Sequence, residues 1–208
     1  MDRPEEPAPI GYYYSVRSVY AYLGAARITE LARQSGRKLR HLPIDLSQVV
    51  PAFGSTPFAE RSARRRAHQF EVEVKRWSDW LQIPVVLHPV HHHGDRLLPS
   101  SCVLAAQALG LDVDGFSLAL LTALWRDDRD IGHEDVLACI AKDCGISPGA
   151  MLDLAHSEQI QKQFQQCTEK AISEGVPGSP TYIVDDELYF GQDRLMFVER
   201  HLTLEAGV

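Results

Sequence analysis

The sequence lacks three features that would each have indicated a different class of protein. It has four cysteines but no Cys-x-x-Cys pair, and dithiol exchange needs one thiolate to attack and a second to resolve the mixed disulfide. No apolar run is long enough to span a bilayer. Basic residues number 21 against 28 acidic ones, giving a formal charge of −7, which disfavours a nucleic-acid partner. We therefore expect neither a thiol-disulfide oxidoreductase nor a protein of membranes or nucleic acids.

The chain is long enough to bury a sizeable core, since 208 residues fit one domain or one domain with a large insertion. Its start, Met-Asp-Arg-Pro-Glu-Glu-Pro, is polar and proline-rich, unlike a signal peptide. Scattered, unpaired cysteines suit a reducing compartment. These features predict a cytoplasmic protein, with a loosely held leader over residues 1 to about 8.

The C-terminal stretch 175–202 carries the clearest structural pattern. Two β-rich runs, Thr181–Val184 and Glu187–Phe190, flank the turn pair Asp185-Asp186, which predicts a β-hairpin. A helix is expected to follow, because apolar residues recur at helical spacing at Leu195, Val198 and Leu202. Pro180 opens the first strand, where it interrupts no ladder hydrogen bond, and the Ser179-Pro180 bond is a place where a cis peptide costs little.

The first part of the chain predicts a β-α-β unit. Ile10–Ser15 is aromatic and β-prone, a helix begins at Ser18 or Val19 and ends at Ser35-Gly36, and Leu39–Leu46 reads as a second strand. A right-handed crossover makes the two strands parallel. The middle is predicted to be helical, over Phe58–Leu81, Ser100–Leu109, Gly115–Trp125, His133–Cys144, Ser147–Leu154 and Ser157–Glu174.

Two motifs, Gly-Val-Pro-Gly-Ser-Pro-Thr and then Tyr-Phe-Gly-Gln-Asp-Arg-Leu, close the chain. In this order and spacing they resemble the 2-hydroxychromene-2-carboxylate isomerases and the related kappa-class glutathione transferases, within the DsbA-like group. The resemblance covers nearly all of the chain after the leader. It implies an α/β, thioredoxin-like fold (β-α-β, then β-β-α) with a large all-helical insertion: residues 9–56 and 175–208 form the thioredoxin-like domain and 57–174 the inserted domain. It also implies a homodimer.

Ser18 is the leading candidate for chemistry. It lies between the first strand and the first helix, so its hydroxyl would sit at the positive end of the helix dipole, beside free backbone N–H groups. Such a location favours an anion and, for a bound thiol, the thiolate. A plain N-cap serine would occupy the same place. The resemblance implies that this serine is catalytic and hydrogen-bonds the sulfur of glutathione, the implied cofactor.

The turn before Ser18 departs from the family pattern. The isomerases usually carry Asp-Phe-x-Ser-Pro, whereas this chain has Ser15-Val16-Arg17-Ser18-Val19. Arg17 places a charge beside the reactive sulfur. Two interpretations stay open: the charge stabilises a thiolate or a substrate carboxylate, or it marks a changed substrate or a lost activity.

Further cofactor contacts follow from the resemblance. Ser179, followed by Pro180, would offer its N–H and C=O to the tripeptide in the manner of an added strand. Gln192 and Asp193 match the pair that holds the γ-glutamyl end, although Asp193 is equally suited to be an N-cap. Ser55 stands where the family usually has a ligand-binding asparagine.

Two other groups of residues have a structural explanation as well as a functional one. Trp77 matches a tryptophan near the family's substrate pocket, and core packing explains it as well. His91-His92-His93 suggests a metal, but adjacent histidines on a loop cannot all face one ion, and no Glu or Cys stands at ligand spacing. No metal site is expected.

The function implied by the resemblance is isomerisation of a small aromatic catabolite. Glutathione thiolate would add to a conjugated enone, a double bond would become a rotatable single bond, and elimination would return the cofactor unchanged. Two alternatives stay open. One is a kappa-like glutathione S-transferase, which uses the same thiolate on an external electrophile. The other is a binding protein on the same scaffold whose chemistry is weakened by the altered turn.

Overall fold

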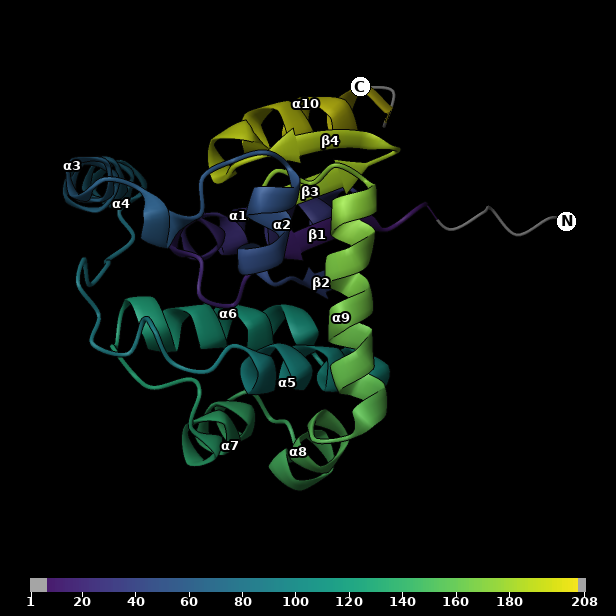
Figure 1. The fold of residues 1–208 in the computed structure, drawn as a ribbon. Helices are drawn as coiled ribbons and strands as arrows, with labels where there is room; N and C mark the ends of the chain where they lie inside the picture. The colour runs from purple at the N-terminus through teal and green to yellow at the C-terminus, as the bar shows by residue number, and fades with distance from the viewer. Residues whose placement is uncertain (1–6, 206–208) are drawn as a thin grey trace, which may run out of the picture.

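A four-stranded mixed sheet forms the centre of the protein (Figure 1). The computed structural model describes residues 7–205, so most of the predicted leader and residues 206–208 of the predicted C-terminal domain lie outside it. The strand order is β2-β1-β3-β4; β1 and β2 are parallel, and β3 is antiparallel to both β1 and β4. The strands are β1 Ile10–Tyr14, β2 Leu39–Pro43, β3 Thr181–Val184 and β4 Glu187–Phe190. The predicted parallel pair and hairpin are confirmed.

The helices fall into three groups along the chain. The crossover between β1 and β2 is α1 Val19–Gln34, and the chain closes with the 3₁₀ turn η3 Gln192–Arg194 and α10 Leu195–Glu205. All others lie between β2 and β3: α2 Leu46–Ala52, η1 Phe58–Glu60, α3 Ala63–Ala67, η2 His68–Val74, α4 Lys75–Leu81, α5 Leu97–Ala108, α6 Val113–Trp125, α7 Glu134–Asp143, α8 Pro148–Ala155 and α9 Glu158–Ser173. Among them, no helix within residues 7–205 combines the length and the apolar content that crossing a bilayer requires.

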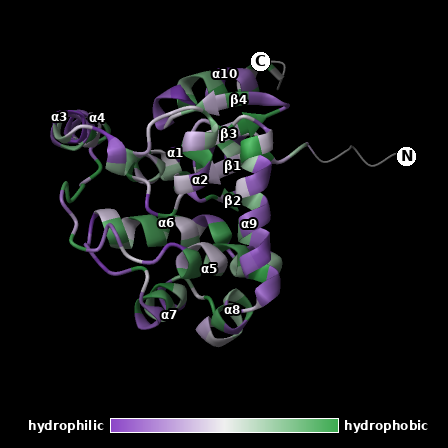
Figure 2. Cartoon of the chain, in the orientation of Figure 1, coloured by the Kyte–Doolittle hydropathy of each residue, from purple (hydrophilic) through white to green (hydrophobic). Residues whose placement is uncertain are grey.

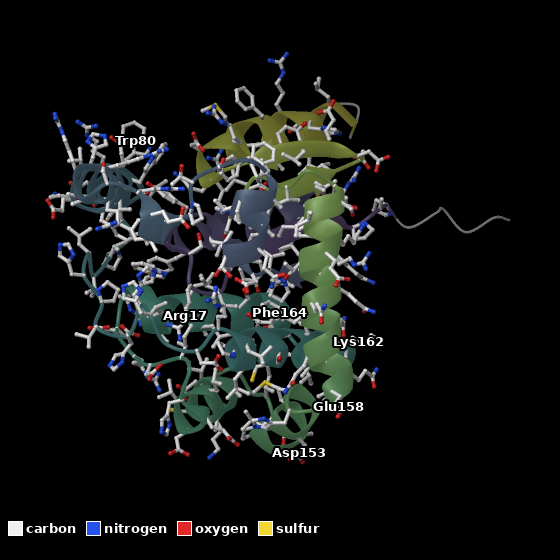
Figure 3. All side chains as sticks on the ribbon, viewed as in Figure 1. Arg17, Trp80, Asp153, Glu158, Lys162 and Phe164 are labelled. Carbon is white, nitrogen blue, oxygen red and sulfur yellow. The ribbon has the colours of Figure 1, made fainter. Side chains whose placement is uncertain are left out.

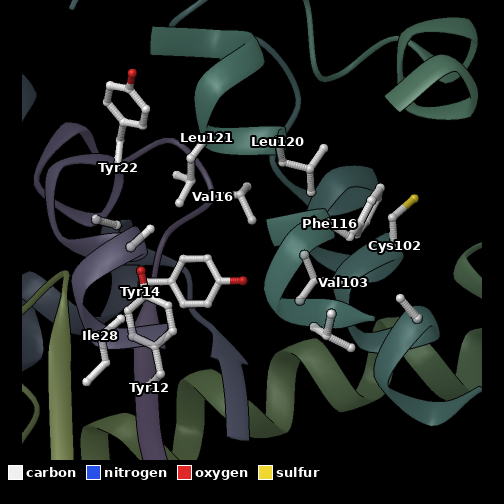
Figure 4. Close-up of a cluster of buried hydrophobic side chains, with 14 of the residues drawn as sticks. Tyr12, Tyr14, Val16, Tyr22, Ile28, Cys102, Val103, Phe116, Leu120 and Leu121 are labelled. Atoms are coloured by element: carbon white, nitrogen blue, oxygen red, sulfur yellow. The ribbon is translucent and has the colours of Figure 1, made fainter. Parts of the chain in front are cut away.

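Both faces of the sheet are covered, which explains why β1 is so thoroughly aromatic. Tyr12 and Tyr14 belong to the larger core, with residues of α1, α5 and α6 (Figure 4). Tyr13 belongs to a second core on the opposite face, with Leu42 and residues of α2 and α9. Because successive residues of a strand point to opposite faces, a strand covered on both sides becomes continuously apolar instead of alternating.

Helix α9 contributes to the sheet's own packing although it falls inside the predicted insertion 57–174. It contacts β2 and α2 as well as α5, and its Phe164, Cys167 and Ala171 are buried in the second core. Figure 1 shows it running along the side of the molecule from the helical half to the sheet, and Figure 2 shows that much of its visible surface is hydrophilic. Of the other helices of the insertion, α6–α8 pack on one another, on α5 and on α1, while α5 also contacts β2 and α9, and α4 contacts η2 and α1.

Two local predictions were wrong. The predicted strand Leu39–Leu46 ends at Pro43, and a helix, α2, begins at Leu46 because the Asp45 side chain accepts the Ser47 N–H at 2.9 Å and caps it. The single helix predicted over Phe58–Leu81 is broken. Its first part is a 3₁₀ turn, Ser62 caps the short α3, and η2 is a π-helix. The other helices begin and end within three residues of their predicted limits.

Candidate functional site

The N-terminus of α1 and the segment before β3 meet at two serines. The Ser18 hydroxyl accepts the Ala21 N–H at 3.2 Å, which makes Ser18 the N-cap of α1, and donates to the Ser179 carbonyl at 3.3 Å. The Ser15 N–H in turn donates to the Ser179 hydroxyl at 3.0 Å. These contacts join positions separated by more than 160 residues, so the first and last parts of the chain converge on Ser18.

This convergence leaves backbone hydrogen-bonding capacity open. Val19 and Tyr20, in the first turn of α1, have no intrahelical acceptor for their N–H groups. Within residues 7–205 the Ser179 N–H makes no hydrogen bond, and the Ser179 carbonyl accepts only the long bond from Ser18. The Ser179-Pro180 bond is cis. The arrangement therefore offers one unused donor and one weakly used acceptor to an extended backbone, beside the positive end of a helix.

Gln192 and Asp193 reach the same region through β4. The Gly191 N–H donates to the Pro180 carbonyl at 2.9 Å, and η3 begins at the next residue. Gly191 has a φ of 104°, and a Cβ at that position would collide with the Asp193 carboxylate, so glycine lets this carboxylate lie over the backbone. Gln192 is buried, whereas Asp193 remains accessible and pairs with Arg194 at 3.3 Å.

Tyr20, in the first turn of α1, interacts electrostatically with charged groups from three other parts of the chain. Burial raises the pKa of Tyr20 to about 12; Glu73 and Asp193 add to the rise, while Arg61 opposes it. These groups come from α1, η2, η3 and the loop between η1 and α3. The signal that could have found Tyr20 is the run Tyr20-Ala21-Tyr22-Leu23 directly after the Ser18 turn, and no local pattern pointed to Glu73 or Arg61.

Three of the predicted site residues lie elsewhere or face another way. Ser55 is exposed on the loop after α2, and its only contact among the described residues is its N–H donating to the Val50 carbonyl. Trp77 is half-buried on α4 and packs against the larger core. Arg17 is adjacent to Ser18 in sequence, but its guanidinium is buried against backbone carbonyls of residues 91–95. Their roles towards a ligand stay predictions.

The cysteines are remote from Ser18. Cys102 and Cys167 are buried, and burial raises the pKa of their thiols to about 12 and about 11. Cys144 is half-buried with a raised pKa for the same reason, and Cys139 is exposed on α7. Because the thiolate is the reactive form, the two buried thiols are held in their unreactive state.

A hollow of about 570 Å³ opens beside α9, at a distance from the serines. Its lining includes Glu158, Lys162 and Phe164, which Figure 3 labels along α9, together with Gln48 and Leu97. None of the predicted site residues lines it. A second hollow, of about 690 Å³, lies beside β4 and α10. Neither changes the assignment of the candidate site to the α1 N-terminus.

Comparisons with known proteins find relatives over nearly the whole length of the chain. The model of the DSBA-like thioredoxin domain family matches residues 10–203. Two proteins named 2-hydroxychromene-2-carboxylate isomerase are each 26% identical: that of Pseudomonas sp. (strain C18) over 91% of this chain and 88% of its own length, and that of Sphingobium xenophagum over 93% and 97%. A solved structure of a 2-hydroxychromene-2-carboxylate isomerase superposes with a TM-score of 0.79 at 23% identity, covering 95% of each chain.

Proposed function

The chain belongs to the DSBA-like thioredoxin domain family, and from this premise we propose that it is a glutathione-dependent isomerase of small aromatic compounds related to 2-hydroxychromene-2-carboxylate. The relatives that match most of its length support an isomerase. One observation carries the finer proposal: Ser18 caps α1 and touches Ser179, whose N–H is unused, so that an anion site and a backbone docking edge lie side by side.

The residues present fit a tripeptide thiol. The unused Ser179 N–H and its carbonyl suit an extended peptide, and the Asp193 carboxylate suits an ammonium group near the start of η3. Ser18 suits the sulfur, because its hydroxyl can exchange the long bond to the Ser179 carbonyl for a shorter one to an anion. That exchange would also free the carbonyl to accept an N–H from the ligand.

The chain's contribution to the reaction is to bind and to hold charge. Bound glutathione would supply a thiolate that adds to a conjugated enone, permits rotation and then leaves. Ser18 and the first N–H groups of α1 stabilise negative charge at the sulfur, both before addition and after elimination. Tyr20 keeps its proton at neutral pH, since its pKa is raised to about 12, and so remains a hydrogen-bond donor facing the site.

Calorimetry with reduced glutathione tests the binding half of the proposal. We expect one site, weakened by Asp193→Ala, and an ultraviolet thiolate absorbance that falls in Ser18→Ala. Ligand at about a hundred times its dissociation constant should stabilise the protein by roughly 2.7 kcal/mol in thermal unfolding. Absence of binding at millimolar glutathione would contradict the proposal.

Isomerase activity is then measured on 2-hydroxychromene-2-carboxylate with glutathione in amounts well below the substrate. An isomerase returns the thiol, so turnover continues; a transferase, which the same activated thiolate would serve, consumes one glutathione per product and stops. Continued turnover with unchanged total thiol supports the isomerase. Stoichiometric loss of thiol with an electrophile would favour the transferase instead.

We also propose a cytoplasmic homodimer. Four free cysteines and dependence on glutathione both suit a reducing compartment. Apolar side chains of β4 and α10 are exposed, namely Leu188, Phe190, Met196, Phe197 and Leu204, and exposed apolar groups gathered on neighbouring elements are typical of an interface. Sedimentation of the wild type against Phe197→Glu tests this: a dimer that becomes monomeric in the variant supports it, and a monomeric wild type contradicts it.

A further inference from the structure

Arg17 binds a loop of the insertion rather than the site beside it. Its side chain is 8% exposed, and its guanidinium donates to the His91 carbonyl at 2.6 Å, to the His92 carbonyl at 3.1 Å, and through Nε to the Asp95 carbonyl at 2.8 Å. A second nitrogen also donates to Asp95. Because carbonyls carry no net charge, the Asp130 carboxylate, 4.0 Å away, is the nearest balancing anion.

Two glycines make room for this cation. A Cβ on Gly94 would lie 2.8 Å from the Arg17 terminal nitrogen, and a Cβ on Gly132 would lie 3.3 Å from it and 3.1 Å from Asp130. A Cβ on Gly94 would force the guanidinium or the loop to shift, and a Cβ on Gly132 would be tighter than most real contacts, so glycine at both positions favours the close packing of the two loops on Arg17. Figure 3 labels Arg17 close to α6, where the sheet half meets the helical half.

The loop 91–95 has little internal support. Its own backbone bonds are long: the His92 N–H to the Pro89 carbonyl at 3.5 Å and the Gly94 N–H to the His91 carbonyl at 3.4 Å. Its outer end is held by Asp128, whose carboxylate accepts the Val90 and His91 N–H groups at 3.1 and 3.3 Å. Arg17 and Asp128 therefore bind the backbone of this loop, while the Asp95 carboxylate accepts the Leu97 and Leu98 N–H groups where α5 begins.

The same loop presents an aromatic surface next to the turn. The His92 ring lies 4.9 Å from the Trp125 ring and 5.9 Å from Phe70, and Phe70 lies 5.3 Å from Phe58 near the loop that carries Ser55. The Trp125 Nε1 is buried without a partner among the described residues, and a hydrogen bond with the Arg17 backbone partly offsets the lowering of the His92 pKa by burial. Trp125 is fully buried, so the half-buried rings of His92, Phe70 and Phe58 are the part of this cluster that a flat aromatic compound could contact.

We propose that Arg17 is a positioning residue that fixes the histidine loop 91–95 against the Ser18 turn and so sets how the aromatic substrate binds. Part of this inference rests on the proposed function, because the substrate is taken from it. The attachment of the loop by Arg17 does not. Arg17, which distinguishes this chain's turn from the isomerase pattern, thus holds the neighbouring loop. Its guanidinium N–H groups bind the carbonyls of that loop rather than the thiolate.

Hydrogen exchange tests the attachment in the free protein. In Arg17→Met, the backbone amides of 91–95 should exchange about tenfold faster, since a local opening no longer breaks the guanidinium bonds. Arg17→Lys, which keeps the charge but reaches fewer carbonyls, should be intermediate. Asp128→Ala, the matched control at the outer end, should also speed exchange there while leaving residues 15–18 unchanged. Unaltered exchange of 91–95 in a folded Arg17→Met protein would overturn the proposal.

Kinetics with 2-hydroxychromene-2-carboxylate and calorimetry with glutathione test the consequence. Arg17→Met should raise KM for the chromene about tenfold and change the dissociation constant of glutathione less than about threefold, with Arg17→Lys between. Asp128→Ala should shift KM in the same direction. If Arg17→Met instead weakens glutathione binding as strongly as Asp193→Ala and leaves KM for the chromene unchanged, the residue acts on the cofactor and the proposal fails. A wild type that binds no glutathione defeats the proposed function, while hydrogen exchange still decides the role of Arg17.

Discussion

Two polar clusters join the sheet to the helices, and they differ in what they leave open. At the first, the Ser18 hydroxyl makes a long bond of 3.3 Å to the Ser179 carbonyl, and the Ser179 N–H has no acceptor among residues 7–205. At the second, the Tyr14 hydroxyl lies 2.7 Å from Ser117 and 3.1 Å from His41 Nδ1, whose Nε2 is 2.7 Å from Asp114. The backbone of His41 is also paired, in both directions, with the Gln107 side chain.

The difference separates a binding site from a structural network. Buried polar groups that are fully satisfied stabilise one arrangement and have nothing left for a ligand, whereas unused donors at a helix N-terminus are available to one. An aspartate and a histidine in contact, joined to a serine through the Tyr14 hydroxyl, would suggest catalysis at first sight. Because these side chains already hydrogen-bond one another and His41 is buried, we infer that they hold β1 and β2 to α6.

Ser18→Ala should have the largest effect on function. Removing one donor to a developing anion typically costs about a hundredfold in rate, and the pKa of the bound glutathione thiol should rise. Loss of the cap should also lower the free energy of unfolding by about 1 kcal/mol. The checks are the isomerase rate and the pH dependence of thiolate absorbance.

Ser157→Ala is the matched control for Ser18→Ala. Ser157 caps α9 in the same way, accepting the Ile160 N–H at 3.3 Å, but lies away from the site. It should lose a similar free energy of unfolding and keep its activity. Equal loss of activity in both variants would show that Ser18 is only a cap, and the contrast between the clusters would disappear.

Tyr14→Phe should have the next largest effect, on stability alone. It deprives Ser117 and His41 of a buried partner, which costs about 1–2 kcal/mol. Tyr12 provides the control, because its ring stacks on Tyr14 at 4.2 Å while its buried hydroxyl has no partner. Tyr12→Phe should change the free energy of unfolding by less than about 0.5 kcal/mol. Urea unfolding measures both; equal losses would contradict the distinction.

Asp193→Asn should raise the dissociation constant of glutathione about tenfold, or about 1.4 kcal/mol, because the bond to the ligand's ammonium group loses its charge on the protein side. Calorimetry measures the change. Asp153→Asn, on the exposed surface of α8 (Figure 3), is the control and should bind as the wild type does. If Asp193→Asn also binds normally, Asp193 serves as a turn residue and the γ-glutamyl end lies elsewhere.

Local patterns predicted the hairpin and the α1 N-cap because the cause of each is local. Asp185 and Asp186 both have positive φ, at 47° and 66°, between two β-rich runs, as a tight hairpin turn requires. Ser18 stands where a strand passes into a helix, so its place at the N-terminus followed from chain order. Both could be deduced from residues within a few positions of each other.

What the sequence did not show depends on distant parts of the chain. The acceptors of Arg17 lie 74 to 78 positions away, so its direction depends on how the insertion folds back. The π-helix η2 and the short α3 follow no simple period, and a long amphipathic run is therefore easily taken for one helix. The role of α9 on the sheet was missed for the same reason: its partners are Leu42 and Val49, more than a hundred residues earlier.

The two histidines give the smallest expected effect and the finest test of the contrast. His41 has both ring nitrogens within hydrogen-bonding distance of buried or half-buried side chains, whereas His92 interacts with the Arg17 backbone, and burial, followed by His93 and Arg17, lowers the pKa of His92 to about 4. An unfolded histidine has a pKa of about 6.5. Between these two pKa values the unfolded state binds a proton that the folded state does not bind, so stability contributed by neutral His92 is present above about pH 6.5 and is lost as pH falls towards about 4.

His92→Phe, which keeps an aromatic ring against Trp125, should therefore flatten the decline of unfolding free energy over that range and leave the curve parallel to that of the wild type above about pH 7. Urea unfolding across this pH range decides the matter: an unchanged slope in the variant would mean that the His92 ring is hydrated in solution, and that the loop bound by Arg17 is looser than its contacts indicate.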